Sequence, residues 1–242
     1  MNSISNLPYK LPMPPRQLIL GISLRDNAAF DNYYSGSNEE AVYNLKQCAE
    51  GKGEQFIYLW GQEGTGKSHL LQAMCKEVGD NAVYLPLFEL HELVPEMLEG
   101  LESMEVVCID DIDQISGKEA WELQIFALFN RMRESGHRLV ISASKKPADL
   151  NMNLPDLLSR LTWGLSQHLK PLNDDQKLAA LQLRADKRGF ELPDNVGRYL
   201  LKHSPRNLPA LFDLLDHLDE ASLAEQRKLT IPFVKQVAGF DT

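Results

Sequence analysis

The stretch "GQEGTGKS", residues 61–68, decides the fold, because it fits the phosphate-binding pattern G-x-x-x-x-G-K-[ST]. The apolar run at 55–60 predicts a strand before it, and the spacing of apolar residues in 67–78 predicts a helix after it. Glycines let such a loop curl until its N–H groups face a phosphate, with the positive end of the helix behind them. A chance glycine turn is the alternative, but the elements on both sides favour the phosphate loop.

Every residue of this loop is a candidate ligand of a nucleotide: Gly61, Gln62, Glu63, Gly64, Thr65, Gly66, Lys67 and Ser68. We expect the Lys67 ammonium to span the β- and γ-phosphates and the Ser68 hydroxyl to bind Mg²⁺. Such a site also needs an acid on the side of the metal.

The stretch "VVCIDDID", residues 106–113, supplies that acid at the end of an apolar run. We expect Asp110 to bind the Mg²⁺ shell through water and Asp111 to stand near an attacking water. A solvated acidic turn is the alternative. The next central strand ends in Ser142 and Ser144, where a polar side chain could reach the γ-phosphate, although small polar residues also end strands in ordinary turns.

The rest of the chain divides into an alternating part and a helical part. Apolar runs predict four more strands, at 82–87, 105–110, 138–144 and 164–169. The spacing of apolar residues also predicts a helix at 120–135. Strands that alternate with crossover helices form a parallel sheet covered on both faces. The fold class expected is therefore α/β, a P-loop parallel sheet flanked by helices.

Beyond Pro171 the strand patterns stop. Asn173 and Gln176 have capping-box spacing, Gly189 predicts the end of the helix that they begin, and three more helical patterns follow. We expect an extended leader, an α/β nucleotide-binding domain and a small all-helical domain, with boundaries at 1–26, 27–170 and 171–242.

Composition limits the classes of protein to which the chain can belong. A chain of 242 residues with 43% hydrophobic content can bury a full core, and a net charge of −9 argues against a sequence-independent grip on nucleic acid. The three cysteines, Cys48, Cys75 and Cys108, form no CxxC pair, which argues against a disulfide framework and indicates a reducing cytoplasm. The first residues lack the pattern of a signal peptide, and no apolar run approaches the length of a membrane span.

The leader contains an apolar stretch, "RQLILGISL" at 16–24, after four prolines at positions 8, 12, 14 and 15. Its apolar side chains pack either on this protein's own surface or on another protein. Extended peptides bind partners through a few apolar anchors and one polar residue that sets the register. The residues alone favour packing on the protein itself.

Several motifs together resemble the AAA+ ATPases, and most of all the central ATPase region of the DnaA replication initiators. They are "YYSGSNEEAV", "GTGKSHLLQA", "CIDDID", "LPDLLSRLTWG" and "LTIPFVKQV", and the resemblance spans about residues 25 to 240. Initiators continue into a helix-turn-helix DNA-binding domain, which we do not expect here because the sequence ends at Thr242. The chain is therefore more similar to the Hda group of short DnaA-related regulators.

This resemblance implies roles for individual residues. Arg160 matches the arginine finger that acts in trans, and Arg206 matches the sensor-2 arginine. Ser144 stands at the sensor-1 position, where initiators have Asp, and Asp111 stands where most AAA+ proteins have Glu. Because Asp is shorter by one methylene, slow intrinsic hydrolysis is implied.

The resemblance also implies partners. A leader peptide of the family binds the DNA polymerase III β sliding clamp, and here it corresponds to Gln17, Leu18, Leu20 and Ile22. The function implied is regulatory inactivation of DnaA by stimulated hydrolysis of its ATP, with ADP or ATP and Mg²⁺ as cofactors and DNA reached through the clamp. The oligomeric state stays open. The alternatives are a non-catalytic, nucleotide-dependent adaptor and an independent P-loop enzyme such as a loader ATPase or a kinase.

Overall fold

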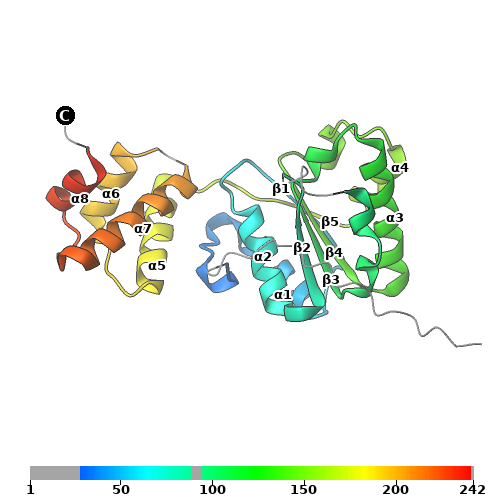
Figure 1. The fold of residues 1–242 in the computed structure, drawn as a ribbon, viewed down its shortest axis with the longest axis horizontal. Helices are drawn as coiled ribbons and strands as arrows, with labels where there is room; N and C mark the ends of the chain where they lie inside the picture. The colour runs from blue at the N-terminus through cyan, green and yellow to red at the C-terminus, as the bar shows by residue number, and fades with distance from the viewer. Residues whose placement is uncertain (1–27, 89–93, 206, 241–242) are drawn as a thin grey trace, which may run out of the picture.

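The computed structural model describes residues 28–88, 94–205 and 207–240. Figure 1 shows an α/β domain built around one sheet and a helical domain beside it. No helix among the described residues is long and apolar enough to cross a membrane.

Five parallel strands form the sheet, in the order β2-β3-β4-β1-β5. They are β1 (Phe56–Trp60), β2 (Ala82–Pro86), β3 (Val106–Asp110), β4 (Arg138–Ala143) and β5 (Leu165–His168). All five predicted strands are confirmed, with ends that shift by one residue or so. The central strand β3 is buried along its whole length, which explains its unbroken apolar sequence, since both faces of a parallel sheet are covered.

Helices cover the two faces of the sheet in pairs (Figure 1). The helices α1 (Glu39–Ala49) and α2 (Lys67–Val78) lie on one face, and α3 (Glu119–Ser135) and α4 (Pro155–Leu161) lie on the other. Side chains of β1 alternate between them: Leu59 packs in the cluster under α2, and Tyr58 in the cluster under α3. This alternation gives the α/β domain two apolar cores, one on each side of the sheet.

Two features differ from the expected pattern of strands and crossover helices. Helix α1 has no counterpart among the predicted elements. Between β2 and β3, residues 94–105 contain two 3-10 turns, Pro95–Leu98 and Leu101–Ser103, and no regular helix. Gly100, whose φ is +85°, separates the two turns.

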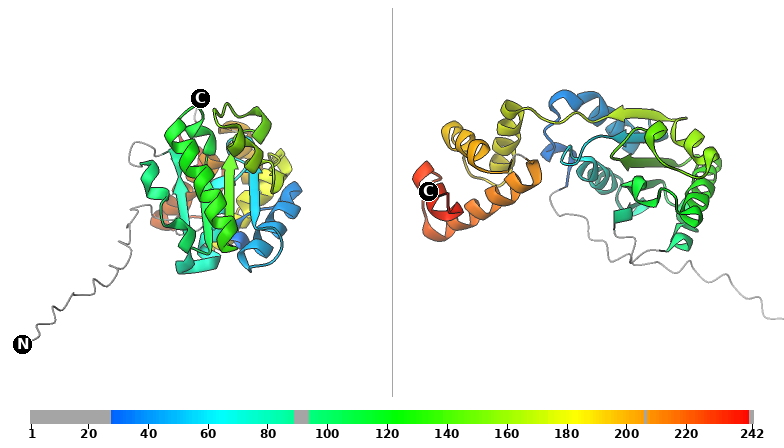
Figure 2. Two further views of the ribbon diagram at one scale, coloured as in Figure 1. Left: turned by 90° about the vertical axis from the view of Figure 1, so that its right-hand side faces the viewer. Right: turned by 90° about the horizontal axis from the view of Figure 1, so that it is seen from above.

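The helical domain has a core of its own. It consists of α5 (Asp174–Lys187), α6 (Asp194–His203), α7 (Leu208–Glu225) and α8 (Ile231–Ala238). The predicted capping box is confirmed: Gln176 N donates to Asn173 Oδ1 (2.9 Å), and Asn173 N donates to Gln176 Oε1 (3.0 Å). Apolar residues up to Leu169 pack in the cores of the sheet, and those from Leu178 onward pack among the four helices. Figure 2 shows from two further sides that this domain stands beyond α1 and α2.

Candidate nucleotide-binding site

The loop 61–66 joins the end of β1 to the start of α2, as predicted. Gly64 and Gly66 have φ of +79° and +89°, which allow the chain to turn back over the helix. Gly61 N donates to the carbonyl oxygen of Ala143 (3.2 Å), so the loop is tied to the end of β4. No described side chain caps α2, and its first N–H groups therefore remain available to an anion.

A segment ahead of the sheet holds this loop from outside. The Tyr33 hydroxyl donates to the carbonyl oxygen of Thr65 (3.0 Å), and its ring lies so close that a Cβ on Gly66 would be 2.5 Å from Tyr33 Cε2. The buried Asn38 side chain donates to the Tyr33 hydroxyl (3.3 Å) and to the carbonyl oxygen of Lys170 (3.0 Å), and Lys170 N donates back to Asn38 Oδ1 (2.8 Å). One polar cluster thus joins the loop to the connection between the domains. The sequence analysis missed it.

Lys67 is almost fully buried, with 8% of its surface exposed. Its Nζ donates to the carbonyl oxygens of Gly61 (3.1 Å) and Gln62 (3.4 Å). A buried ammonium is stable only with polar or anionic partners. A glycine loop, an uncapped helix and a buried cation together fit the phosphates of a nucleotide.

The acids predicted on the metal side lie at the ends of β3 and β4. Asp110 is fully buried: Oδ2 accepts a hydrogen bond from the Tyr84 hydroxyl (2.7 Å), and Oδ1 accepts one from Ser142 Oγ. Burial raises the pKa of Tyr84, the charge of Asp110 raises it further, and hydrogen bonds with Gln72 and Ser68 lower it. The Tyr84 hydroxyl thus holds Asp110, one of the two residues predicted to bind Mg²⁺.

These residues also limit how a metal could be held. No group of three or more His, Cys, Asp and Glu among the described residues could hold a metal ion. Mg²⁺ commonly keeps water and binds through one or two carboxylates together with substrate phosphates. Ser68 and Asp110 fit that mode of binding, in which the nucleotide completes the coordination.

Asp111 follows the strand in a left-handed conformation, with φ of +58° and ψ of +54°. Its N–H donates to Ser142 Oγ (2.9 Å). Burial raises the pKa of its carboxyl to about 6, the charge of Asp110 also raises this pKa, and the Lys67 ammonium lowers it. The charges of Asp110 and Lys67 therefore both act on the carboxyl of Asp111.

The two serines at the end of β4 have different surroundings. Ser142 is buried and contacts both Asp110 and Asp111, whereas Ser144 is exposed and donates from N (3.0 Å) and Oγ (2.9 Å) to Asp113. Ser142 is thus the serine that orders the acid pair. The sensor role of Ser144 stays a prediction.

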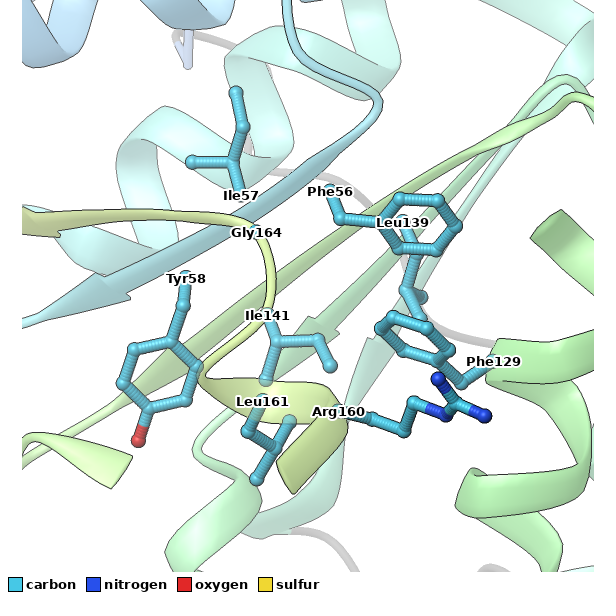
Figure 3. Close-up of a pocket in the computed structure, with 9 residues that line it drawn as sticks. All are labelled: Phe56, Ile57, Tyr58, Phe129, Leu139, Ile141, Arg160, Leu161 and Gly164. Atoms are coloured by element: carbon cyan, nitrogen blue, oxygen red, sulfur yellow. The ribbon is translucent and has the colours of Figure 1, made fainter. Parts of the chain in front are cut away.

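Arg160 lies on the other face of the sheet, near the end of α4. Its guanidinium carbon is 6.0 Å and 5.9 Å from the ring centres of Phe126 and Phe129 on α3. With Phe56 and Gly164 it lines a small pocket beside the amino-terminal half of β1, as Figure 3 shows. The phosphate loop follows the opposite end of β1, so this side chain and the loop lie at different ends of the strand.

Five predicted site residues lie outside the described residues: Arg206 and the leader residues Gln17, Leu18, Leu20 and Ile22. The helix after Arg206 is described. Asn207 Oδ1 accepts a hydrogen bond from Ala210 N (2.8 Å) and caps α7. A Cβ on Gly64 would lie 3.6 Å from Pro209 Cδ, so the start of α7 meets the phosphate loop.

Two family models match the two domains of the chain. Residues 87–168 match the bacterial DnaA ATPase domain, and residues 174–238 match the lid domain of Hda. Residues 21–120 also match a family described as a protein of unknown function.

Solved structures share the fold. Domain III of the replication initiation protein DnaA from Thermotoga maritima is 23% identical, with a TM-score of 0.76 over 89% of this chain and 97% of that chain. AMPPCP-bound DnaA from Aquifex aeolicus is 23% identical, with a TM-score of 0.69 over 81% and 66%. The RuvB Holliday junction branch migration motor from Thermotoga maritima is 15% identical, with a TM-score of 0.65 over 87% and 72%.

The family models and the shared fold agree with each other and with the resemblance of the motifs. The matched lid model begins at the first helix after the sheet, and the matched ATPase model ends with the last strand. The chain is a DnaA-like AAA+ protein with a lid domain of the Hda type.

Proposed function

We propose that this protein binds ADP or ATP with Mg²⁺ and stimulates hydrolysis of the ATP held by a DnaA partner, so that repeated initiation of replication is prevented. The observation that carries the proposal is the placement of Arg160. Its guanidinium lies 6.0 Å and 5.9 Å from the centres of two aromatic rings, in a pocket beside the start of β1, whereas the protein's own phosphate loop follows the end of β1. A cation in that position is available to a nucleotide on another subunit.

The chemistry of an arginine suits this role. A guanidinium presents five N–H donors in a rigid planar fork and stays charged, so it can stabilise charge on a phosphoryl group during transfer. Such a finger is worth about 10³–10⁵ in rate. The rings of Phe126 and Phe129 lie within about 6 Å of the group, a distance at which a cation is attracted to an aromatic ring.

The protein's own nucleotide has a different task in this proposal. Lys67 would hold phosphate, and Ser68 and Asp110 would hold Mg²⁺, which when bound would supply positive charge beside the phosphates. Asp111 is short for a residue that orients water, so turnover at this site is slow. Because the start of α7 contacts the loop, nucleotide sets the angle of the lid, with Arg206 as the link to phosphate.

A clamp-binding leader completes the proposal. Gln17, Leu18, Leu20 and Ile22 anchor the protein on the β sliding clamp, which brings it to DNA without a basic surface of its own. This part rests on the sequence motif and the net charge of −9. It places the protein in the cytoplasm with the replication machinery.

The test compares ATP hydrolysis by this chain alone, by DnaA alone, by both, and by both with the clamp loaded on DNA. We expect slow hydrolysis by each protein alone and fast hydrolysis only in the complete mixture. Fast hydrolysis by the isolated chain would favour a loader-type ATPase, and a mixture without stimulation would favour an adaptor. Replacement of Gln17 and Leu18 by Ala should abolish the effect of the clamp and leave melting temperature and nucleotide affinity unchanged.

A further inference from the structure

A buried glutamate on α3 joins two loops that are far apart in the sequence. Glu122 is fully buried. Its Oε1 accepts a hydrogen bond from Gly117 N (2.7 Å), and its Oε2 accepts one from Leu154 N (2.7 Å). Among the described residues, no salt bridge reaches this carboxylate, and its two oxygens accept hydrogen bonds from these two backbone N–H groups. A buried carboxylate held by backbone N–H groups fixes the positions of those groups.

The first loop belongs to the metal side of the nucleotide site. After Asp110 and Asp111 the chain forms a 3-10 turn, Ile112–Ile115, and then reaches Gly117. The second loop leads into α4. Asn153 Nδ2 donates to the carbonyl oxygen of Gly117 (3.4 Å), so the two loops also touch directly.

Helix α4 depends on such support at its start. It has seven residues, Leu154 at its N-cap has no side-chain oxygen with which to cap it, and Pro155 has no N–H. Helices this short have little stability of their own, and tertiary contacts set their direction. Leu157 and Leu161 anchor one side of α4 in the core, and Glu122 holds its first turn.

We propose that Glu122 is a positioning residue for Arg160. Its carboxylate fixes the start of α4 against the loop that follows the acid pair, so that the guanidinium near the end of α4 is held at the angle required by the partner's phosphates. The inference rests on the proposed function of Arg160. A displacement of about 1 Å in a group that acts in the transition state can cost about 10² in rate.

Variants of Glu122 separate these contacts. In Glu122→Gln one oxygen remains an acceptor, while the NH₂ group faces the second N–H and cannot accept from it. Glu122→Ala removes both acceptors. Glu134→Gln is the matched control, because Glu134 is an exposed glutamate on the same helix.

The experiment uses the full chain with DnaA, the clamp on DNA and ATP. We expect Glu122→Gln to lower the stimulated kcat by roughly 10- to 100-fold, with little change in the concentration that gives half-maximal stimulation or in the protein's own nucleotide Kd. Glu134→Gln should behave like the wild type. In the background of Arg160→Ala, Glu122→Gln should have no additional effect on the rate, because Glu122 acts through Arg160.

Two controls decide between positioning and stability. Ile125→Val removes one buried methyl group from the same helix and should lower the stability of the fold without touching either loop. If it lowers the stimulated kcat as much as Glu122→Gln, or if Glu122→Gln does not fold, the carboxylate serves stability alone and the inference is wrong. If Arg160→Ala loses stimulation while Glu122→Gln keeps it, the inference fails and the proposed function stands. If Arg160→Ala stimulates normally, both fail.

Discussion

Charged side chains have different surroundings in two regions of the α/β domain, the ends of β3 and β4 and the helix α4. At the ends of β3 and β4, both carboxylate oxygens of Asp110 accept hydrogen bonds from hydroxyl groups of this chain. On α4, the guanidinium of Arg160 lies about 6 Å from the centres of two aromatic rings and has no carboxylate partner among the described residues. In the proposed function, the first region holds a ligand of the protein's own, and the second offers a charge to another molecule.

Charge sharpens this comparison. The pKa of Asp111 is raised first by burial and then by the charges of Asp110, Asp113 and Glu63, while Lys67 lowers it. Asp111 thus feels the repulsion of three other acids and the attraction of one lysine, and a nucleotide would bring further negative charge. A divalent cation relieves this repulsion, which supports the proposal that Mg²⁺ enters with the nucleotide.

The largest effect is expected from Arg160→Ala. It should lower stimulated hydrolysis by DnaA about 10³- to 10⁵-fold, because the transition state loses its cation. The protein's own nucleotide Kd should not change, since this side chain and the loop lie at different ends of β1. Arg160→Lys should recover little activity because a point charge cannot replace the planar fork. Arg133→Ala, an exposed arginine on α3, is the control.

A smaller effect is expected from Lys67→Ala. A hydrogen bond to a charged group contributes about 1.5–3 kcal/mol, so nucleotide affinity should fall by roughly 10- to 150-fold. Isothermal titration of the isolated chain with ADP and Mg²⁺ measures the change. Lys187→Ala, on the exposed surface of α5, should leave the affinity unchanged. Equal affinities for Lys67→Ala and the wild type would refute the phosphate role of this lysine.

The parts of the molecule that are local in sequence could be predicted. The loop 61–68 and helix α2 follow from glycine spacing and apolar periodicity within about twenty residues, and α2 has the predicted ends Lys67 and Val78. The strand before Asp110 and the capping box at Asn173 follow in the same way. In each case, the residues that determine the element lie within it or directly beside it in the sequence.

The groups that the sequence did not reveal depend on the order of the strands. Tyr84 reaches Asp110 only because β2 pairs with β3, in a register that sets Tyr84 beside Cys108. The sequence marks Ser142 as a polar residue at a strand end, but its contact with the acid pair depends on β4 being the other neighbour of β3. Glu122 appears in the sequence as one more glutamate on a helix, and its role depends on contacts to residues 117 and 154. Likewise, nothing in the apolar run that contains Tyr84 indicates that its hydroxyl binds Asp110.

Tyr84→Phe tests how tightly the acid region is held. The change removes the hydroxyl that donates to Asp110 and leaves one carboxylate oxygen of a buried side chain without that donor. We expect the free energy of unfolding to fall by about 1–3 kcal/mol in urea denaturation. Tyr43→Phe, at a tyrosine that is 63% exposed, is the control. Equal stability of the two variants would mean that water or another group replaces the hydroxyl.

The smallest expected effect concerns the pH dependence of stability and the charge of Asp111. Because burial and the neighbouring acids raise its pKa to about 6 from the usual value of 3.8, the folded protein binds this proton more tightly than the unfolded chain. The stability gained from that proton is fully present below about pH 4 and is lost as the pH rises through about 6. Asp111→Asn removes the titration and keeps a residue type that tolerates the φ of +58° at this position.

In the nucleotide-free protein with EDTA, the variant should therefore gain stability relative to the wild type between about pH 4 and pH 6, and the difference should stay constant above pH 7. Addition of Mg²⁺ with ADP should reduce this pH dependence, because a cation at Ser68 and Asp110 favours the carboxylate form of Asp111. Urea denaturation of both proteins across this range measures the effect. A difference in stability that does not change with pH would show that the Asp111 carboxyl is solvated like a surface acid. The difference between the two regions would then be smaller than we infer, because Asp111 would be as accessible to water as a charge on the surface.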